Sequence, residues 1–75
     1  MEQEDLIIRD PKIMLGKPIY KGTRLTVELI LRKLADGLSP EEISTLYPNI
    51  TEEHLKATYN YCAEIISNEL LIRTS

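Results

Sequence analysis

The segment from Gly16 to Arg24 concentrates residues that could bind an anion. It contains two of the three glycines and three of the nine cations of the 75-residue chain. Glycine allows tight turns and close approach of a ligand to the backbone, and cations beside such turns attract negative charge. We therefore predict that Lys17, Lys21, Thr23 and Arg24 contact DNA phosphates or the carboxylates of a partner protein.

A purely structural explanation of the same segment stays open. Gly22 alone could form a turn, and Arg24 could pair with Glu28 one helical turn later. The segment lacks the spacing of a nucleotide-binding P-loop, so a nucleotide site is not predicted.

Charge is unevenly distributed along the sequence, although the net charge is only −3. Residues 9–33 carry seven cations and two carboxylates, whereas residues 34–75 carry two cations and seven carboxylates. Because the chain as a whole is acidic, it would bind nucleic acid only through a local basic surface. The basic segment 9–33 is therefore the first place to expect DNA contacts, and an ordinary mixed surface whose charges are segregated only in sequence is the alternative.

The elements that would position these cations begin with a hairpin region, residues 6–25. Three short apolar runs, 6–8, 13–15 and 19–20, are separated by segments that contain Pro11 and Gly16. Runs of this length between turn residues predict two or three short strands.

Three helices are predicted within residues 26–70. The first, over residues 27–36, follows the capping residue Thr26 and ends at Gly37. The second begins with Ser39 and Glu42 as a capping box around Pro40, and it ends near Tyr47 because Pro48 follows. Apolar spacing in the second helix predicts that Ile43, Leu46 and Tyr47 face the core.

The third helix is predicted to follow the cap Thr51 and to reach about residue 70, a length of about 28 Å at ~1.5 Å per residue. Its apolar residues at positions 55, 59, 62, 66 and 70 form one stripe, and Tyr61, Ile65 and Ile72 form a second. Because two short helices cannot cover this length, the N-terminal strands, another copy of the chain or a partner protein must cover the second stripe. Of these, we predict a homodimer or a partner protein.

Successive helices joined by short turns are typical of helix-turn-helix proteins that bind double-stranded DNA. In that arrangement the third helix would read the DNA, with Lys56 and Asn60 as candidate contacts. Glu52 and Glu53 would oppose the phosphates at the start of the same helix. A bundle whose third helix binds protein and not DNA therefore stays open.

Neither a catalytic site nor a metal or cofactor site is predicted. His54 lies near a helix N-terminus and is predicted to be a half-exposed surface residue, and Cys62 on the apolar stripe is predicted to be an inert thiol and not a nucleophile. One histidine and one cysteine are too few for a zinc site within one chain. A lone cysteine, the acidic start of the chain and the lack of a long apolar run predict a cytoplasmic protein without a membrane-spanning segment.

Several motifs along residues 6–66 together resemble one family of small bacterial and archaeal proteins, the domain-of-unknown-function 433 family. These motifs are Ile8–Pro11, Gly16–Ile19, Gly22–Val27, Leu34–Ile43, Tyr47–Pro48, Ile50–Thr51 and Ala57. The chain differs mildly from the family pattern at Tyr20 and at Leu25–Thr26.

The resemblance implies a homeodomain-like fold similar to the DNA-binding domain of VapB-type antitoxins, and a PIN-like ribonuclease toxin as partner. It implies no catalytic residue, and its signature comprises Gly16, Lys17, Pro18, Gly22, Thr23 and Arg24.

The sequence thus predicts one domain over residues 1–75, a mainly α, three-helix helix-turn-helix bundle with a short N-terminal β-hairpin. Two functional hypotheses follow. The first is an antitoxin-like regulator that neutralises a ribonuclease and represses its own promoter. The alternative is a protein-interaction module without a role in DNA binding or catalysis.

Overall fold

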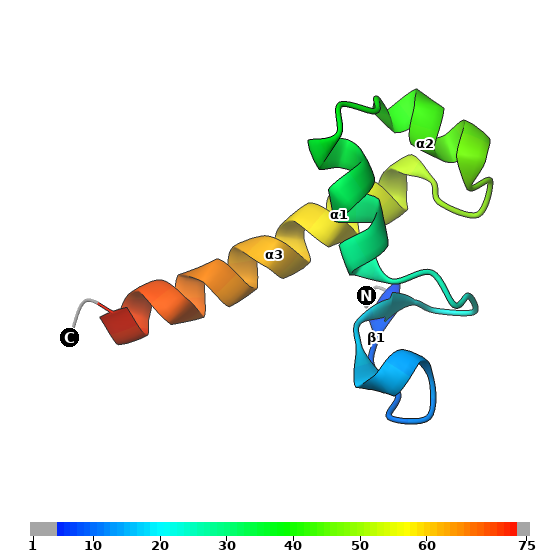
Figure 1. The fold of residues 1–75 in the computed structure, drawn as a ribbon. Coiled ribbons are helices and arrows are strands. Elements are labelled where there is room, and N and C mark those ends of the chain that lie inside the picture. The colour runs from blue at the N-terminus through cyan, green and yellow to red at the C-terminus, as the bar shows by residue number, and fades with distance from the viewer. Residues whose placement is uncertain (1–4, 74–75) are drawn as a thin grey trace.

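The computed structural model describes the backbone of residues 5–73 and the side chains of residues 5–68. A short two-stranded antiparallel hairpin precedes three helices, which confirms the predicted fold class (Figure 1). The elements are β1 (Ile7–Ile8), the 3-10 helix η1 (Met14–Gly16), β2 (Ile19–Tyr20), α1 (Val27–Ala35), α2 (Pro40–Leu46) and α3 (Glu52–Arg73).

The hairpin pairs Ile7 with Tyr20 and Ile8 with Ile19. The second apolar run, residues 13–15, does not form a strand. Met14, Leu15 and Gly16 have φ values of 50°, 59° and 80°, in the left-handed region that cannot extend into a strand. Leu15 is 92% exposed, so this run is a tight turn at the surface, although its composition is apolar.

Local capping signals fix α1 and α2 where the sequence predicted them. The Thr26 hydroxyl accepts a hydrogen bond from the Leu29 N–H, and Gly37 ends the first helix with a φ of +100°. Ser39 and Glu42 form the expected reciprocal capping box, with Pro40 in the first turn. Each cap satisfies N–H groups that the helix itself leaves unbonded.

The start of α3 uses a histidine in the role that glutamate has in a capping box. His54 Nδ1 accepts from the backbone N–H of Thr51 at 3.1 Å and lies 2.9 Å from the Thr51 hydroxyl. His54 was predicted as a half-exposed surface residue, and its half-buried position agrees. The ring nitrogen therefore has a structural partner in this fold.

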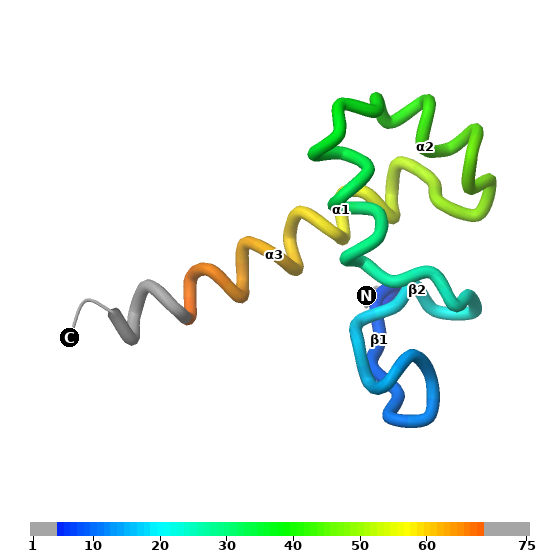
Figure 2. The backbone as a smooth tube through the Cα atoms, in the orientation of Figure 1, coloured from blue at the N-terminus to red at the C-terminus, as the bar shows by residue number. Residues whose placement is uncertain are grey.

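The core lies where α1, α2, β2 and the first turns of α3 meet (Figure 2). Ile43 is the buried residue of α2, as predicted, but Leu46 is 56% exposed, so its predicted inward orientation is wrong. A seven-residue helix has about two turns, and here it presents a single side chain to the core. The buried apolar cluster consists of Tyr20, Val27, Ile30, Ile43, Ile50 and Leu55.

α3 extends well beyond this core, as Figures 1 and 2 show. Its 22 residues span about 33 Å at ~1.5 Å per residue. Leu55 and Thr58 are its buried residues within the described side chains, whereas Tyr59, Ile65 and Ile66 are 50%, 47% and 55% exposed. The prediction that two short helices leave this helix uncovered is confirmed for these residues.

Candidate interaction surfaces

A buried hydrogen-bonded chain fixes the hairpin on α3. The Tyr20 hydroxyl lies 2.6 Å from Thr58 Oγ1, and Thr58 Oγ1 donates to the His54 carbonyl at 2.8 Å. Because the single hydroxyl proton of Thr58 is already donated, Tyr20 must be the donor to Thr58. The Tyr20 ring also meets the His54 ring edge-on, with centroids 5.7 Å apart. Burial raises the pKa of the Tyr20 hydroxyl above its ordinary value.

The Gly-Thr-Arg motif shapes the turn that follows β2. The Thr23 hydroxyl donates to the Tyr20 carbonyl at 2.8 Å and accepts from the Leu25 N–H at 2.9 Å. Gly22 has a φ of +83°, which favours glycine. Thr23, a predicted binding residue, therefore has its hydroxyl engaged inside the turn.

The Gly-Lys-Pro motif has a comparable structural role. Gly16 closes the left-handed turn with a φ of +80°, and the Pro18 carbonyl accepts from the Val27 N–H at the start of α1. Lys17 lies between them and pairs with Glu28, with Nζ 3.3 Å from Oε1. The motif is thus joined to α1 at two places, by one backbone hydrogen bond and by one side-chain ion pair.

Glu28 joins two cations on one exposed surface. Arg32 Nη2 lies 3.0 Å from Glu28 Oε2, whereas Lys17 contacts the other carboxylate oxygen, Oε1. Hydrogen bonds from Arg32, and then from Lys17, lower the pKa of the Glu28 carboxyl below its ordinary value. The interactions that lower this pKa stabilise the folded state above pH 4.5, where the Glu28 carboxylate is ionised. Their contribution is lost as the pH falls through the folded pKa. Solvent screening keeps the effect small.

The predicted alternative pairing of Arg24 with Glu28 is wrong, because Lys17 and Arg32 are the partners of Glu28. Lys21 and Arg24 are exposed and form no ion pair among the described residues. They are the two predicted hairpin contacts whose charged groups remain available to an anion.

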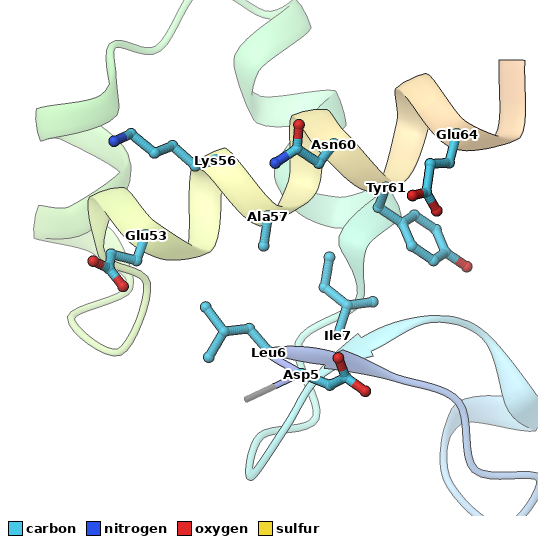
Figure 3. A pocket seen from close by; sticks show the side chains of 9 residues that line it. All are labelled: Asp5, Leu6, Ile7, Glu53, Lys56, Ala57, Asn60, Tyr61 and Glu64. Carbon is cyan, nitrogen blue, oxygen red and sulfur yellow. The ribbon is translucent and has the colours of Figure 1, made fainter. Parts of the chain in front are cut away.

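Lys56 and Asn60 lie elsewhere, in an open groove of about 860 Å³ between α3 and β1 (Figure 3). Its lining includes three carboxylates, Asp5, Glu53 and Glu64, against the one cation Lys56. None of the four predicted hairpin residues lines it. The structure therefore divides the predicted nucleic-acid contacts between a basic hairpin and a predominantly acidic groove.

The predicted partner face is also divided. Tyr61 is half-buried in the groove, Ile65 is exposed one turn further along α3, and Ile72 lies outside the described side chains. Tyr59 and Ile66, which the prediction did not include in this face, are at least as exposed as Ile65. The apolar spacing of the sequence already indicated Tyr59 and Ile66, because they continue the stripe that begins at the buried Leu55.

Two other properties concern the described residues. No group of three or more His, Cys, Asp or Glu side chains there is placed to hold a metal ion. None of the helices in this part of the chain has the length and apolar character needed to cross a bilayer.

Comparison with known proteins gives matches at the level of sequence and of fold. A family model described as "Protein of unknown function (DUF433)" matches residues 7–62. The structure is similar to the crystal structure of a DUF433 member protein from Anabaena variabilis ATCC 29413. The TM-score is 0.78 at 24% identity, over 95% of this chain and 68% of that chain. None of the curated proteins compared with this chain matches it.

Proposed function

Because this chain belongs to the DUF433 family of proteins of unknown function, we propose a regulatory role for it that rests on protein binding. In this proposal it is the antitoxin-like member of a two-protein system. It forms a homodimer or docks a PIN-like ribonuclease through α3, and it represses its own promoter through the basic hairpin.

The observation that carries the proposal is the uncovered apolar surface of α3 between Tyr59 and Ile66. Tyr59, Ile65 and Ile66 are each about half exposed on a helix that extends beyond its own bundle. Cys62 is half-buried between them on the stripe that begins at Leu55. Apolar side chains gathered in this way on a surface are typical of protein interfaces.

The charges favour the protein-binding part of the proposal over the DNA-binding part. Glu52 and Glu53 occupy the exposed first turn of α3, where a recognition helix would approach phosphates. Lys17 is paired with Glu28, which leaves Lys21 and Arg24 as the available hairpin cations. The alternative, a protein-interaction module without DNA binding, is therefore retained as the second candidate.

The protein-binding part predicts that Ile66→Asp removes the partner or the dimer. A charge at the centre of an apolar interface would weaken association by about 2 kcal/mol or more, roughly 30-fold or more in Kd. The tagged protein would be purified at its natural level, its companions identified by mass spectrometry, and its mass measured by analytical ultracentrifugation. A stoichiometric small ribonuclease is the expected companion.

Ser67→Asp is the matched control, since it adds the same charge one residue along the same exposed helix. It points about 100° away from Ile66 around a helix of 3.6 residues per turn. Equal loss of the companion in both variants would contradict an interface centred on the apolar stripe. Recovery of wild-type protein as a monomer without a companion would contradict the proposal as a whole.

The DNA-binding part predicts that Arg24→Ala weakens binding to promoter DNA and reduces its dependence on salt. Removal of one phosphate contact reduces the slope of log K against log[salt] by about 0.9. Fluorescence anisotropy at several salt concentrations, with a duplex from the protein's own promoter, measures both quantities. Unchanged affinity and slope for Arg24→Ala would eliminate the hairpin as the DNA contact.

A further inference from the structure

The groove between α3 and β1 lies on a different face of α3 from the apolar stripe. Glu64 lines this groove, and Ile66, two residues later, belongs to the stripe. Two residues correspond to about 200° around a helix with 3.6 residues per turn, so the two side chains point in nearly opposite directions. A partner bound to the stripe would therefore leave the groove accessible.

The groove has an apolar floor between two walls. Figure 3 shows Leu6 and Ile7 of the β1 segment and Ala57 of α3 pointing into the same space, with the Tyr61 ring at one side. All four are only partly buried, so part of each apolar side chain stays accessible to an occupant of the groove. Apolar floors with a few polar groups at the margin are typical of peptide-binding grooves.

The rim of the groove carries an unbalanced negative charge. Asp5, Glu53 and Glu64 face one cation, Lys56, and none of these four groups takes part in an ion pair among the described residues. None of the seven cations of residues 9–33 lines the groove. Among the described residues these carboxylates are uncompensated, which favours an occupant of positive charge.

The walls also indicate the length and shape of an occupant. Glu53 and Glu64 are about 16 Å apart along α3 at ~1.5 Å per residue, which an extended segment of about five residues spans at ~3.3 Å per residue. β1 is paired with β2 on one side only within the described sheet. The Leu6 carbonyl accepts a hydrogen bond from the Lys21 N–H. Hydrogen-bonded and non-hydrogen-bonded residue pairs alternate along an antiparallel ladder, so the N–H and C=O groups of Ile7 point away from β2.

From these observations we propose that the groove binds an extended segment of a partner protein. This segment carries Lys or Arg side chains about five residues apart, with an apolar residue between them. The cations meet Glu53 at one end and Glu64 and Asp5 at the other, and the apolar side chain lies on Leu6, Ala57 and Tyr61. The proposal goes beyond the role of the apolar stripe and does not depend on the partner being a ribonuclease.

A random 12-residue peptide display library panned on the full chain tests the proposal. The most enriched peptide would be synthesised and its Kd measured by fluorescence anisotropy. We expect net positive peptides and a Kd that is roughly 2- to 30-fold weaker for the double variant Glu53→Gln, Glu64→Gln, from the usual strength of two exposed charge pairs. In an NMR titration, the amide chemical shifts that change on addition of the peptide should be those of residues 5–7 and 53–64.

The double variant Glu41→Gln, Glu52→Gln is the matched control. Glu52 neighbours Glu53 in the first turn of α3, and both control residues lie outside the groove. An unchanged Kd for this control supports the proposal, whereas equal weakening of both double variants overturns it. Failure to enrich any peptide, enrichment of acidic or uncharged peptides, or shifts centred on Tyr59 and Ile66 would also overturn it.

A second copy of the chain is the competing occupant. If a second copy occupied the groove, analytical ultracentrifugation would show a dimer for the wild type and a monomer for the Glu53→Gln, Glu64→Gln variant. This result would refute the proposal that a segment of a different protein binds there. The Ile66→Asp experiment concerns the opposite face of α3, so failure of either proposal is distinguishable from failure of the other.

Discussion

Tyr20→Ala is expected to leave most of the protein unfolded at room temperature. Tyr20 is completely buried and is the largest side chain in the core. Its truncation would remove the ring from the cluster and its hydroxyl from Thr58, at a cost of about 3–5 kcal/mol. A domain of this size is rarely stabilised by more than about 3–5 kcal/mol. Urea denaturation followed by far-UV circular dichroism measures the loss.

Two variants separate the roles of the ring and the hydroxyl. Tyr20→Phe keeps the ring and removes the donor to Thr58, which should cost only about 1 kcal/mol. Tyr59→Ala removes a tyrosine that is 50% exposed, and its expected cost is below about 1 kcal/mol. A stable, fully folded Tyr20→Ala protein would show that the core does not depend on this side chain.

Tyr20 also predicts how stability changes at alkaline pH. Its folded pKa is raised above the ordinary 10.0, mainly by burial. Its contribution is therefore fully present below pH 10 and is lost as the pH rises through the folded pKa, because the unfolded chain releases the phenolic proton first. Tyr20→Phe should show a smaller decline above pH 10 than the wild type, measured by urea denaturation at several pH values. Identical declines would assign the effect to other groups.

Ile43→Ala is expected to release α2 from the bundle. Ile43 is fully buried and is the buried side chain of that helix, so its truncation should cost about 2–5 kcal/mol. Leu46→Ala on the same helix is the matched control, because Leu46 is 56% exposed, and it should change stability by less than about 1 kcal/mol. Chemical denaturation gives the difference in free energy of unfolding.

Amide hydrogen exchange would show where this loss occurs. Exchange in Ile43→Ala should increase first in α2 and its flanking turns if the helix opens locally. A Leu46→Ala variant as damaging as Ile43→Ala would mean that α2 packs through a different face.

The parts of this fold that were predictable from the sequence depend on local signals. Thr26, Ser39, Glu42 and Gly37 act within one helical turn of their own positions, so their types mark the ends of α1 and α2. The stripe beginning at Leu55 similarly predicted a long helix that extends past its neighbours. The domain boundaries and the binding residues remain predictions.

The errors arose where a residue type carries no local signal. Met14 and Leu15 adopt left-handed backbone angles that such side chains rarely adopt, so an apolar run resembled a strand. Leu46 has the spacing of a core residue on a helix too short to bury it. The pairing of Lys17 with Glu28 spans eleven positions across a turn, and a sequence pattern cannot rank it against the nearer Arg24.

The groove is a further case of what sequence reasoning missed. Asp5 and Glu64 are far apart in the chain, and they line one surface because the Tyr20–Thr58 hydrogen bond holds the hairpin on α3. The acidic surplus of the second half was visible in the sequence, but its concentration beside β1 depends on tertiary packing. A charge total for a segment does not identify the face on which the charge is displayed.

The hydrogen bonds made by Thr23, together with the left-handed glycines beside it, bear on how relatives are compared. These residues, with Pro18, specify the path of the main chain and leave the side chains of Lys21 and Arg24 exposed. Chains with the same glycines, proline and threonine at these positions would therefore share this path of the main chain. Two such chains could recognise unrelated molecules, and transfer of a ligand from one to the other would require agreement at the exposed positions on the hairpin, in the groove and along α3.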